Sequence, residues 1–462
     1  MSTAEAGDKA VAKYLARHAE PEAEAVPRLP GRFGHALVVP AYGERESLFA
    51  LLGSVPAGPA GPVLIVAVLN ARKESPEPVH AANQSARERL ERELPAATAL
   101  SDAPAIRSYP LAEGGALLLV DRAAPGAFLP EGQGVGLARK IGNDLALRLH
   151  VEGRLASPWL HNTDADTLLT PDYFEQTAGL DAAKTGAAIF FYEHRFEADP
   201  DLALAGRLYE ISLRYYVLGL AWAGSPYAYQ SMGSCLAIPA VSYAKVRGFP
   251  KKNAAEDFYV LDKLAKIGAI ERLAGSPLSL EGRLSDRVPF GTGRALRDLT
   301  GGRRSLANFR LYHPLVFAHL SAWLQLLDRI ASTRGDLARA VAALPPEGPF
   351  FRTGVLEEAL ARFGVSHAVG QARARSSDPA TLRRHLHTWF DAFRTLKLVH
   401  ALRDGGLASL PWQEALAEAP FTGLSASTEE DPEELRRALA DEERKLSRTP
   451  AGVPAMPDIA NA

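Results

Sequence analysis

Short apolar runs alternate with helical patterns through the first three hundred residues, and this alternation constrains the fold more than any other feature. The apolar runs lie at 37–39, 62–70, 115–121 and 158–160. Helical patterns lie between them, at 46–52, at 79–94 and from Gly134 onward, where apolar residues recur every four positions. Buried strands separated by helices are typical of a parallel sheet covered on both faces. The sequence therefore predicts an α/β fold with a Rossmann-like, mostly parallel sheet.

The pattern changes beyond about residue 305, where strand signals give way to helical patterns separated by Pro and Gly. Residues near the N-terminus read as a short Ala-rich helix and a Pro/Glu linker, which we expect to be a mobile tail. The last residues have the composition of a disordered segment. We therefore expect an N-terminal helix and linker, an α/β domain, a helical C-terminal region and a disordered tail, at 1–32, 33–300, 301–448 and 449–462.

Composition excludes several classes of protein. The 462 residues carry a formal charge of -2, so no basic excess indicates a nucleic-acid partner. The single cysteine, Cys235, rules out an intramolecular disulfide and is expected to be a small core residue. No signal-peptide core and no apolar run long enough to span a bilayer are present. We expect a cytoplasmic protein without a transmembrane segment, and peripheral membrane contact through the C-terminal region stays open.

Two carboxylates one residue apart follow the apolar run at 158–160. Asp164 and Asp166 precede Thr170-Pro171, a capping residue and a proline that are typical of a helix start. Ligands bind at such strand-to-helix links in open α/β sheets. Two carboxylates there suit a hard divalent cation that keeps waters and shares a phosphate. A solvated turn, where Asp is also favoured, is the alternative interpretation.

Four features follow one another in the chain: VVPAYGE at 38–44, GVGLARKIG at 134–142, the Asp164/Asp166 pair and Glu256-Asp257. Their combination resembles the family 2 glycosyltransferases, which have the GT-A fold. The similarity covers 33–295, and SDRVPFGTG at 285–293 is similar to a bacterial subgroup with an unassigned acceptor. The chain lacks the QxxRW motif of some processive members, which argues against polymer synthesis.

The resemblance implies a nucleotide-sugar donor whose base packs against the first two strands. Tyr42 and Glu44, with Pro40 and Ala41 before them, would line the base pocket: a ring to stack on the base and a carboxylate to accept its N–H. Asn70 stands where the family usually has an aspartate, so the identity of the base is open, with UDP as the default. A polar loop after a strand is the alternative.

The resemblance also implies a metal site and cations near the diphosphate. Asp166, with Asp164, would hold Mg²⁺ or Mn²⁺ against both phosphates, offsetting the charge of the leaving diphosphate. Arg139 and Lys140 fall on a different helix face from the leucines, and a cation there could reach the diphosphate or organise the Asp164/Asp166 pair; the alternative is a solvated helix face. Arg287, beside a Gly-rich loop, would clamp the diphosphate or else be a surface arginine.

Glu256 and Asp257 begin a helical pattern. Asn253 to Glu256 has capping-box spacing, which would give Glu256 a structural role. Asp257 has no such role, and a carboxylate in the first turn of a helix stays ionised. It would act as the general base that deprotonates the acceptor hydroxyl. The resemblance implies single displacement with inversion, with Glu256 and Asp257 as the catalytic pair.

We therefore predict a metal-dependent inverting glycosyltransferase of bacterial glycan or glycoconjugate synthesis. The acceptor is a lipid-linked glycan, a polysaccharide end or a small molecule. Two alternatives remain. A nucleotidyltransferase of similar fold would release pyrophosphate from a nucleoside triphosphate, and a non-catalytic scaffold would bind the nucleotide sugar without transferring it.

Overall fold

A computed structural model describes residues 3–196, 199–285, 291–301, 308–333, 337–341, 344, 348, 351–424 and 431–447. The chain divides into two compact units. Unit 1 is Met1–Arg195 with Ser231–Gly282, and unit 2 is Phe196–Gln230 with Arg283–Ala462. Residues 196–230 thus group with the C-terminal helices, whereas the sequence placed them in the α/β domain. Arg287 and the tail expected at 449–462 lie outside the described residues.

A nine-stranded sheet forms the centre of unit 1, in the order β11-β8-β10-β6-β1-β2-β5-β4-β3. These strands are β1 (His35–Ala41), β2 (Val63–Asn70), β3 (Thr98–Asp102), β4 (Ala105–Pro110), β5 (Ala116–Arg122), β6 (Trp159–Asn162), β8 (Thr185–Ile189), β10 (Leu236–Pro239) and β11 (Ala269–Arg272). The four adjacent strands β6, β1, β2 and β5 run parallel. The flanking pairings leave only β4 and β10 antiparallel to the rest. The prediction of a mostly parallel sheet is confirmed. A smaller sheet joins β7 (Thr167–Leu168), β12 (Leu278–Gly282) and β9 (Tyr192–Phe196).

Both faces of the central sheet are covered, which explains the continuous apolar runs. Alternate residues Leu37 and Val39 belong to the core that also contains residues of α2 (Glu46–Ser54) and α3 (Glu77–Glu93). On the other face lies α4 (Val135–Val151), so close that a Cβ on Gly142 would lie 2.3 Å from the Val38 side chain. Because successive side chains of a strand point to opposite faces, alternate residues contribute to two separate apolar layers.

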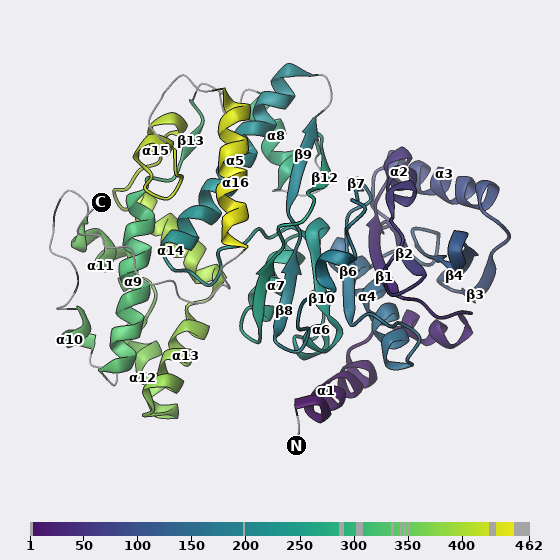
Figure 1. Ribbon diagram of the computed structural model, residues 1–462, viewed down its shortest axis with the longest axis horizontal. Helices are drawn as coiled ribbons and strands as arrows, with labels where there is room; N and C mark the ends of the chain where they lie inside the picture. Colours follow the sequence, from purple (N-terminus) through teal and green to yellow (C-terminus); the bar gives the residue numbers. More distant parts are fainter. Residues whose placement is uncertain are drawn as a thin grey trace. The chain divides into compact units, whose positions relative to one another are not determined.

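The N-terminal segment is packed, and the expectation of a mobile tail is wrong. Helix α1 (Thr3–Arg17) packs on α6 (Ala240–Lys245), and the 3-10 helix η1 (Pro21–Arg28) packs on α4. Figure 1 shows α1, in purple, extending from the N-terminus below α6. The physical reason is burial: Tyr14 and Val26 are each only 1% exposed, so the segment adds apolar contacts that its polar composition conceals.

The helix expected from Pro171 is also wrong. The chain forms turns there and then a single 3-10 turn, η3 (Glu175–Thr177). Tyr173 and Phe174 are both buried, Tyr173 stacks on Phe190 with centroids 4.4 Å apart, and Phe174 packs edge-on against His161. Packing of two consecutive aromatic residues therefore outweighs the local helix-start signal.

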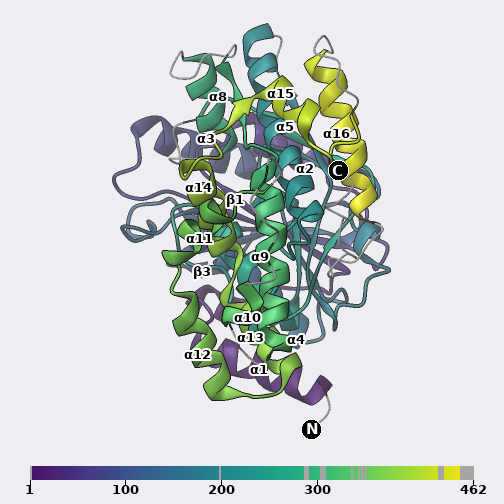
Figure 2. The same cartoon turned by 90° about the vertical axis from the view of Figure 1, so that its left-hand side faces the viewer.

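Unit 2 is mainly helical, as predicted for the C-terminal region, and its core surrounds α9 (Leu315–Ser332). Figure 2 shows α9 near the middle of this unit with α14 beside it. The other elements are α5 (Pro200–Trp222), α8 (Thr292–Thr300), α10 (Leu337–Val341), α11 (Thr353–Ala361), α12 (Val365–Arg375), α13 (Pro379–Trp389), α14 (Ala392–Asp404), α15 (Trp412–Glu418), α16 (Pro432–Leu446) and the two-residue strands β13 (Arg310–Leu311) and β14 (Leu410–Pro411). In the described part of the chain, no helix is long and apolar enough to cross a membrane.

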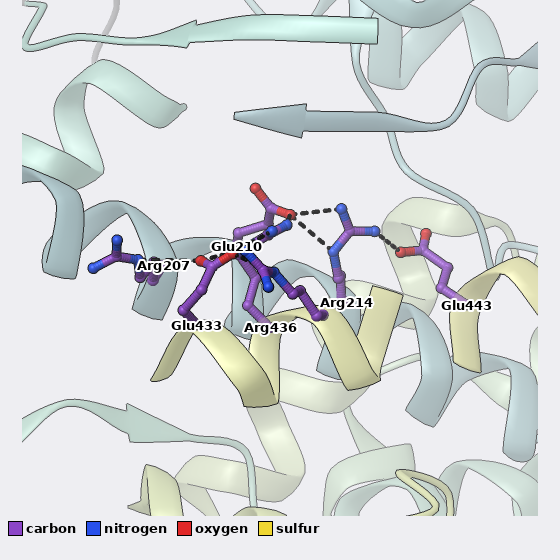
Figure 3. Close-up of polar contacts among 7 residues, drawn as sticks. Arg207, Glu210, Arg214, Glu433, Arg436 and Glu443 are labelled. Carbon is purple, nitrogen blue, oxygen red and sulfur yellow. Dashed lines mark hydrogen bonds and ion pairs between the residues drawn. The ribbon is translucent and has the colours of Figure 1, made fainter. Parts of the chain in front are cut away.

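Helices α5 and α16 are joined by charged side chains that we call the helix-pair network. Its members, drawn in Figure 3, are Arg207, Glu210 and Arg214 of α5 and Glu433, Arg436 and Glu443 of α16. Arg214 donates to Glu210 at 2.6 Å and to Glu443 at 2.7 Å, and Arg436 donates to Glu210 at 2.8 Å. Arg207 and Arg436 both bind Glu433. Arg437 binds Glu433 as well, at the exposed edge of the network, so four arginines lie against three glutamates. The innermost pair, Arg214 and Glu210, is fully buried.

Candidate functional site

Three neighbouring parallel strands of unit 1 deliver the predicted residues to one edge of the sheet. Tyr42 follows β1, Asn70 ends β2, and Asp164 lies in the turn after β6. Because β1 pairs in parallel with both β2 and β6, these three chain ends lie at the same, carboxyl edge. This is the edge where open α/β sheets bind ligands.

The ends of β1 and β2 are fixed to each other by side-chain amides. Asn70 is buried and donates from Nδ2 to the carbonyl of Ala41 at 3.0 Å. Pro40 and Ala41 lie inside β1, paired with β2, so they shape the floor of this region through their backbone. The Asn70 side chain thus joins the end of β2 to the end of β1, and its contact with a nucleotide base stays a prediction.

Tyr42 and Glu44 lie in the loop that leaves β1. The Tyr42 hydroxyl is 3.2 Å from the Ser75 hydroxyl, in the loop after β2. Glu44 is only 4% exposed, and Ser47 donates to its carboxylate at 2.5 Å. A half-buried aromatic ring and a hydrogen-bonded carboxylate thus lie two residues apart in this loop. These are the two groups that the predicted base pocket needs.

Arg139 gathers the acidic residues of the site. It projects from α4 and is 1% exposed. Its guanidinium binds Asp164 Oδ1 at 2.5 Å and Glu256 Oε1 at 3.0 Å. Residues from β6, α4 and α7 (Glu256–Leu264), far apart in the sequence, are therefore held by one side chain. We call Arg139, Asp164, Glu256 and Asp257 the Arg139 cluster.

The start of α7 places both of its carboxylates in this cluster. The predicted capping box is wrong: the N-cap is Ala255, in the left-handed region with φ 60°, and no side chain caps the helix. The Glu256 carboxylate accepts a hydrogen bond from Arg139 Nε at 3.0 Å, and a hydrogen bond from its own backbone N–H acts on it as well. Asp257 accepts hydrogen bonds from the backbone N–H of Phe258 at 2.7 Å and of Gly233 at 2.9 Å.

Gly233 is a site residue that sequence reasoning missed. It begins the 3-10 turn η4 (Gly233–Cys235) just before β10. A Cβ there would lie 2.5 Å from Arg139 Nη2, so only glycine lets the guanidinium pass while its N–H binds Asp257. The small residues at 231–235 were the only signal in the sequence.

Burial and like charge shift the pKa values of both helix-start carboxylates. Burial, and after it the charge of Asp257, raise the pKa of Glu256 to about 7 against the opposing effect of Arg139. Burial also raises the pKa of Asp257 above its usual range. Removal of water favours the neutral form, and one guanidinium does not balance three carboxylates. With all three carboxylates ionised the cluster carries two more negative than positive charges, and proton uptake by Glu256 near neutral pH reduces this excess.

The residues fit a divalent cation that arrives with a phosphate better than a resident metal. Asp164 and Asp166 are both partly exposed at the turn after β6, and Arg139 occupies one Asp164 oxygen. Within the described ranges, no group of three His, Cys, Asp or Glu side chains stands ready to bind a metal. Mg²⁺ and Mn²⁺ sites commonly use one or two carboxylates and complete the shell with substrate phosphates and water.

Lys140 lies away from this cluster, which corrects its predicted place at the diphosphate. Its ammonium is buried and donates to Asp144 at 2.8 Å, to the Tyr14 hydroxyl at 2.5 Å and to the His18 carbonyl at 2.6 Å. Successive residues of a helix point about 100° apart, so Arg139 and Lys140 reach different neighbours. Neither residue is on a solvated face, because α4 is buried from Gly136 to Leu147.

Cys235 has the packing role expected of it, and His161, three residues before Asp164, is also a packing residue. His161 is fully buried among aromatic rings, and burial lowers its pKa to about 3. Cys235 is buried as well, and burial raises the pKa of its thiol to about 12. Neither is a ligand or a nucleophile in this arrangement.

Comparison with known proteins adds little. No family model matches the sequence, and no curated protein matches it. Among solved structures, the chain is similar to mannosyltransferase PcManGT from Pyrobaculum calidifontis in complex with GDP-Man and Mn2+, at 16% identity over 97% of each chain with a TM-score of 0.33. A TM-score of that size does not establish a shared fold, so the site stands on its own geometry.

Proposed function

We propose that this protein is a metal-dependent inverting glycosyltransferase of the GT-A type that transfers a sugar from a nucleotide-diphosphate donor to an acceptor hydroxyl. The observation that carries the proposal is the Arg139 cluster: Arg139 joins Asp164, in the turn after β6, to Glu256 at the start of α7. The donor-side pair and the helix-start pair of carboxylates thus share one buried arginine. Separate solvated turns would not need such a link.

In this proposal each residue has one task. Asp166 and Asp164 hold Mg²⁺ or Mn²⁺, which supplies Lewis-acid stabilisation of the departing diphosphate when bound. Arg139 holds one oxygen of Asp164, which leaves the other oxygen and Asp166 as the carboxylate groups that would bind the cation. Tyr42 and Glu44 bind the base, with UDP as the default donor nucleotide.

Asp257 acts as the general base in the proposal. Its carboxylate takes the proton of the acceptor hydroxyl as that oxygen attacks the anomeric carbon and the nucleoside diphosphate leaves from the opposite face. The N–H of Gly233 holds the carboxylate in place. Glu256 is bound to Arg139, and in the proposal it keeps the start of α7 fixed to the helix that bears Arg139.

Release of nucleoside diphosphate from a panel of nucleotide sugars with Mn²⁺ tests the proposal. Asp166→Ala should lose both turnover and metal-dependent donor binding. Asp257→Ala should keep donor binding and lose turnover by about 10²–10⁴-fold. Undiminished turnover in both variants would refute the assignment. Pyrophosphate release from a nucleoside triphosphate would instead indicate a nucleotidyltransferase, and binding without transfer would indicate a scaffold.

A further inference from the structure

The segment that leads into Glu256 and Asp257 lies directly on the first turn of α4. The backbone N–H of Gly136 donates to the Lys252 carbonyl at 3.0 Å. A Cβ on Gly136 would lie 2.2 Å from the Pro250 carbonyl oxygen, and one on Gly134 would lie 3.0 Å from Asn253 Cα. These glycines therefore serve close backbone approach. We call residues 250–255 the base loop.

Glu20 of the N-terminal segment joins this loop to α4. Its carboxylate binds Lys251 of the base loop at 2.7 Å, and the same oxygen lies 3.6 Å from Lys140 of α4. Its backbone N–H donates to Asp144 of α4 at 2.8 Å. The Glu20 side chain is 11% exposed, so water competes weakly for these contacts. One residue thus holds the base loop and the helix that bears Arg139.

Glu20 is itself held by buried neighbours. The Tyr14 hydroxyl donates to Asp144 at 2.5 Å, and Tyr243 donates to the same carboxylate oxygen at 2.8 Å. Lys140 completes the group at 2.8 Å from the other Asp144 oxygen. Because these contacts fix the backbone of Glu20 on α4, its carboxylate can transmit that position to Lys251.

We propose that Glu20 and Lys251 are positioning residues for the general base. They hold the base loop on α4, so that Ala255 keeps its left-handed conformation and Asp257 stays directed at the Gly233 N–H. An unanchored loop would relax at Ala255, because a side chain disfavours positive φ. Neither residue touches substrate. The inference rests on the proposed function only in naming Asp257 as the base.

The test compares Glu20→Gln and Lys251→Met with Glu24→Gln in the full chain. Glu24 is a matched control, because it lies in the same segment and pairs with Arg148 at 2.7 Å, but its side chain is 73% exposed. Amide hydrogen exchange at 251–258 should rise at least about threefold in both test variants and stay unchanged in Glu24→Gln. In turnover assays kcat should fall about three- to tenfold with the donor KM unchanged.

The outcomes separate the inference from the proposed function. Equal exchange at 251–258 in all three variants would overturn the inference, whatever the turnover. Raised exchange with an unchanged kcat would also overturn it, because the loop would then move without affecting the base. A wild-type chain that transfers no sugar, while the exchange difference persists, would refute the proposed function and leave the anchoring of the loop intact. Lys251→Met keeps the test decisive if Glu20→Gln fails to fold, since the Lys251 side chain is 43% exposed.

Discussion

Two groups of charges, one in each unit, differ in the ratio of arginines to carboxylates. The helix-pair network of unit 2, with Arg437 at its exposed edge, sets four arginines against three glutamates. The Arg139 cluster of unit 1 sets one arginine against three carboxylates, with Asp166 nearby in the turn after β6. In the helix-pair network each glutamate has at least one arginine partner. In the Arg139 cluster the carboxylates outnumber the arginine, and in our proposal a bound metal ion supplies further positive charge.

The pKa shifts in the two groups follow burial. Hydrogen bonds from Arg436 lower the pKa of the half-buried Glu433 in the helix-pair network, whereas burial raises the pKa of Glu443 in the same network. Burial also raises the pKa of Glu256 in the Arg139 cluster to about 7. All three glutamates bind arginine, so the partner alone does not decide the sign. The loss of water decides it.

The largest loss of stability is expected when a buried arginine of the helix-pair network is removed. Arg214→Ala leaves Glu210 and Glu443 short of their buried partner and should lower the free energy of unfolding by about 3–5 kcal/mol. Arg437→Ala removes an exposed partner of Glu433 and should change it by less than about 0.5 kcal/mol. Urea unfolding measures both. Equal effects of the two substitutions would mean that the buried network contributes no more than a surface pair.

The contribution to the pH dependence of stability should have opposite signs for Glu256 and for Glu433. The raised pKa of Glu256 means that the folded state binds its proton more tightly, so stability falls as pH rises from about 4.5 to about 7. Relative to wild type, Glu256→Gln should therefore gain about 1–3 kcal/mol between pH 5 and pH 8.

Glu433→Gln is the corresponding substitution in the helix-pair network. Because the pKa of Glu433 is lowered, its stabilisation is present above the unfolded-state pKa and is lost as pH falls through the folded-state value. The deficit of this variant relative to wild type should shrink in acid. Chemical unfolding at several pH values checks both variants. If the stability difference from wild type changed with pH in the same direction in both, the predicted contrast between Glu256 and Glu433 would be wrong.

Substitution of Gly233 changes a single contact of the Arg139 cluster and should have a smaller effect on stability. Gly233→Ala places a methyl 2.5 Å from Arg139 Nη2 and should destabilise the protein by about 1–3 kcal/mol and impair turnover. Gly53→Ala, with nothing within 4 Å in α2, should stabilise by up to about 1 kcal/mol. Thermal unfolding distinguishes them. If Gly233→Ala changed neither stability nor turnover, Arg139 would not require the absence of a side chain at position 233.

Local patterns predicted the framework of unit 1 and failed where distant packing decides. The runs at 37–39 and 62–70 became β1 and β2, because continuous apolar runs require burial on both faces. The hairpin of β3 and β4 was missed, since its strands are short and half-exposed. The helix expected at Pro171 and the mobile N-terminus were wrong, because Tyr173 and Tyr14 are buried by residues far away in the sequence.

The candidate site shows the same limit. The order of the motifs predicted that Asp164 and Glu256 belong together, but only the structure identifies Arg139 as their shared partner. Lys140, its neighbour in the sequence, serves the N-terminal segment instead. The two side chains leave α4 in different directions, and that of Arg139 passes close to Gly233. Neither fact can be seen in the residue types alone. The roles of Tyr42, Glu44, Asp166 and Asp257 remain predictions.

The central claim is that the excess negative charge beside Arg139 is balanced by a cation bound with a diphosphate. Equilibrium binding of a panel of nucleoside diphosphates, with and without Mn²⁺, tests it most directly in wild type and Asp166→Asn. The account predicts that Mn²⁺ tightens binding of at least one diphosphate about tenfold or more in wild type, equivalent to about 1.4 kcal/mol, and not in the variant. Binding that is indifferent to Mn²⁺, or equally enhanced by it in Asp166→Asn, would contradict the claim.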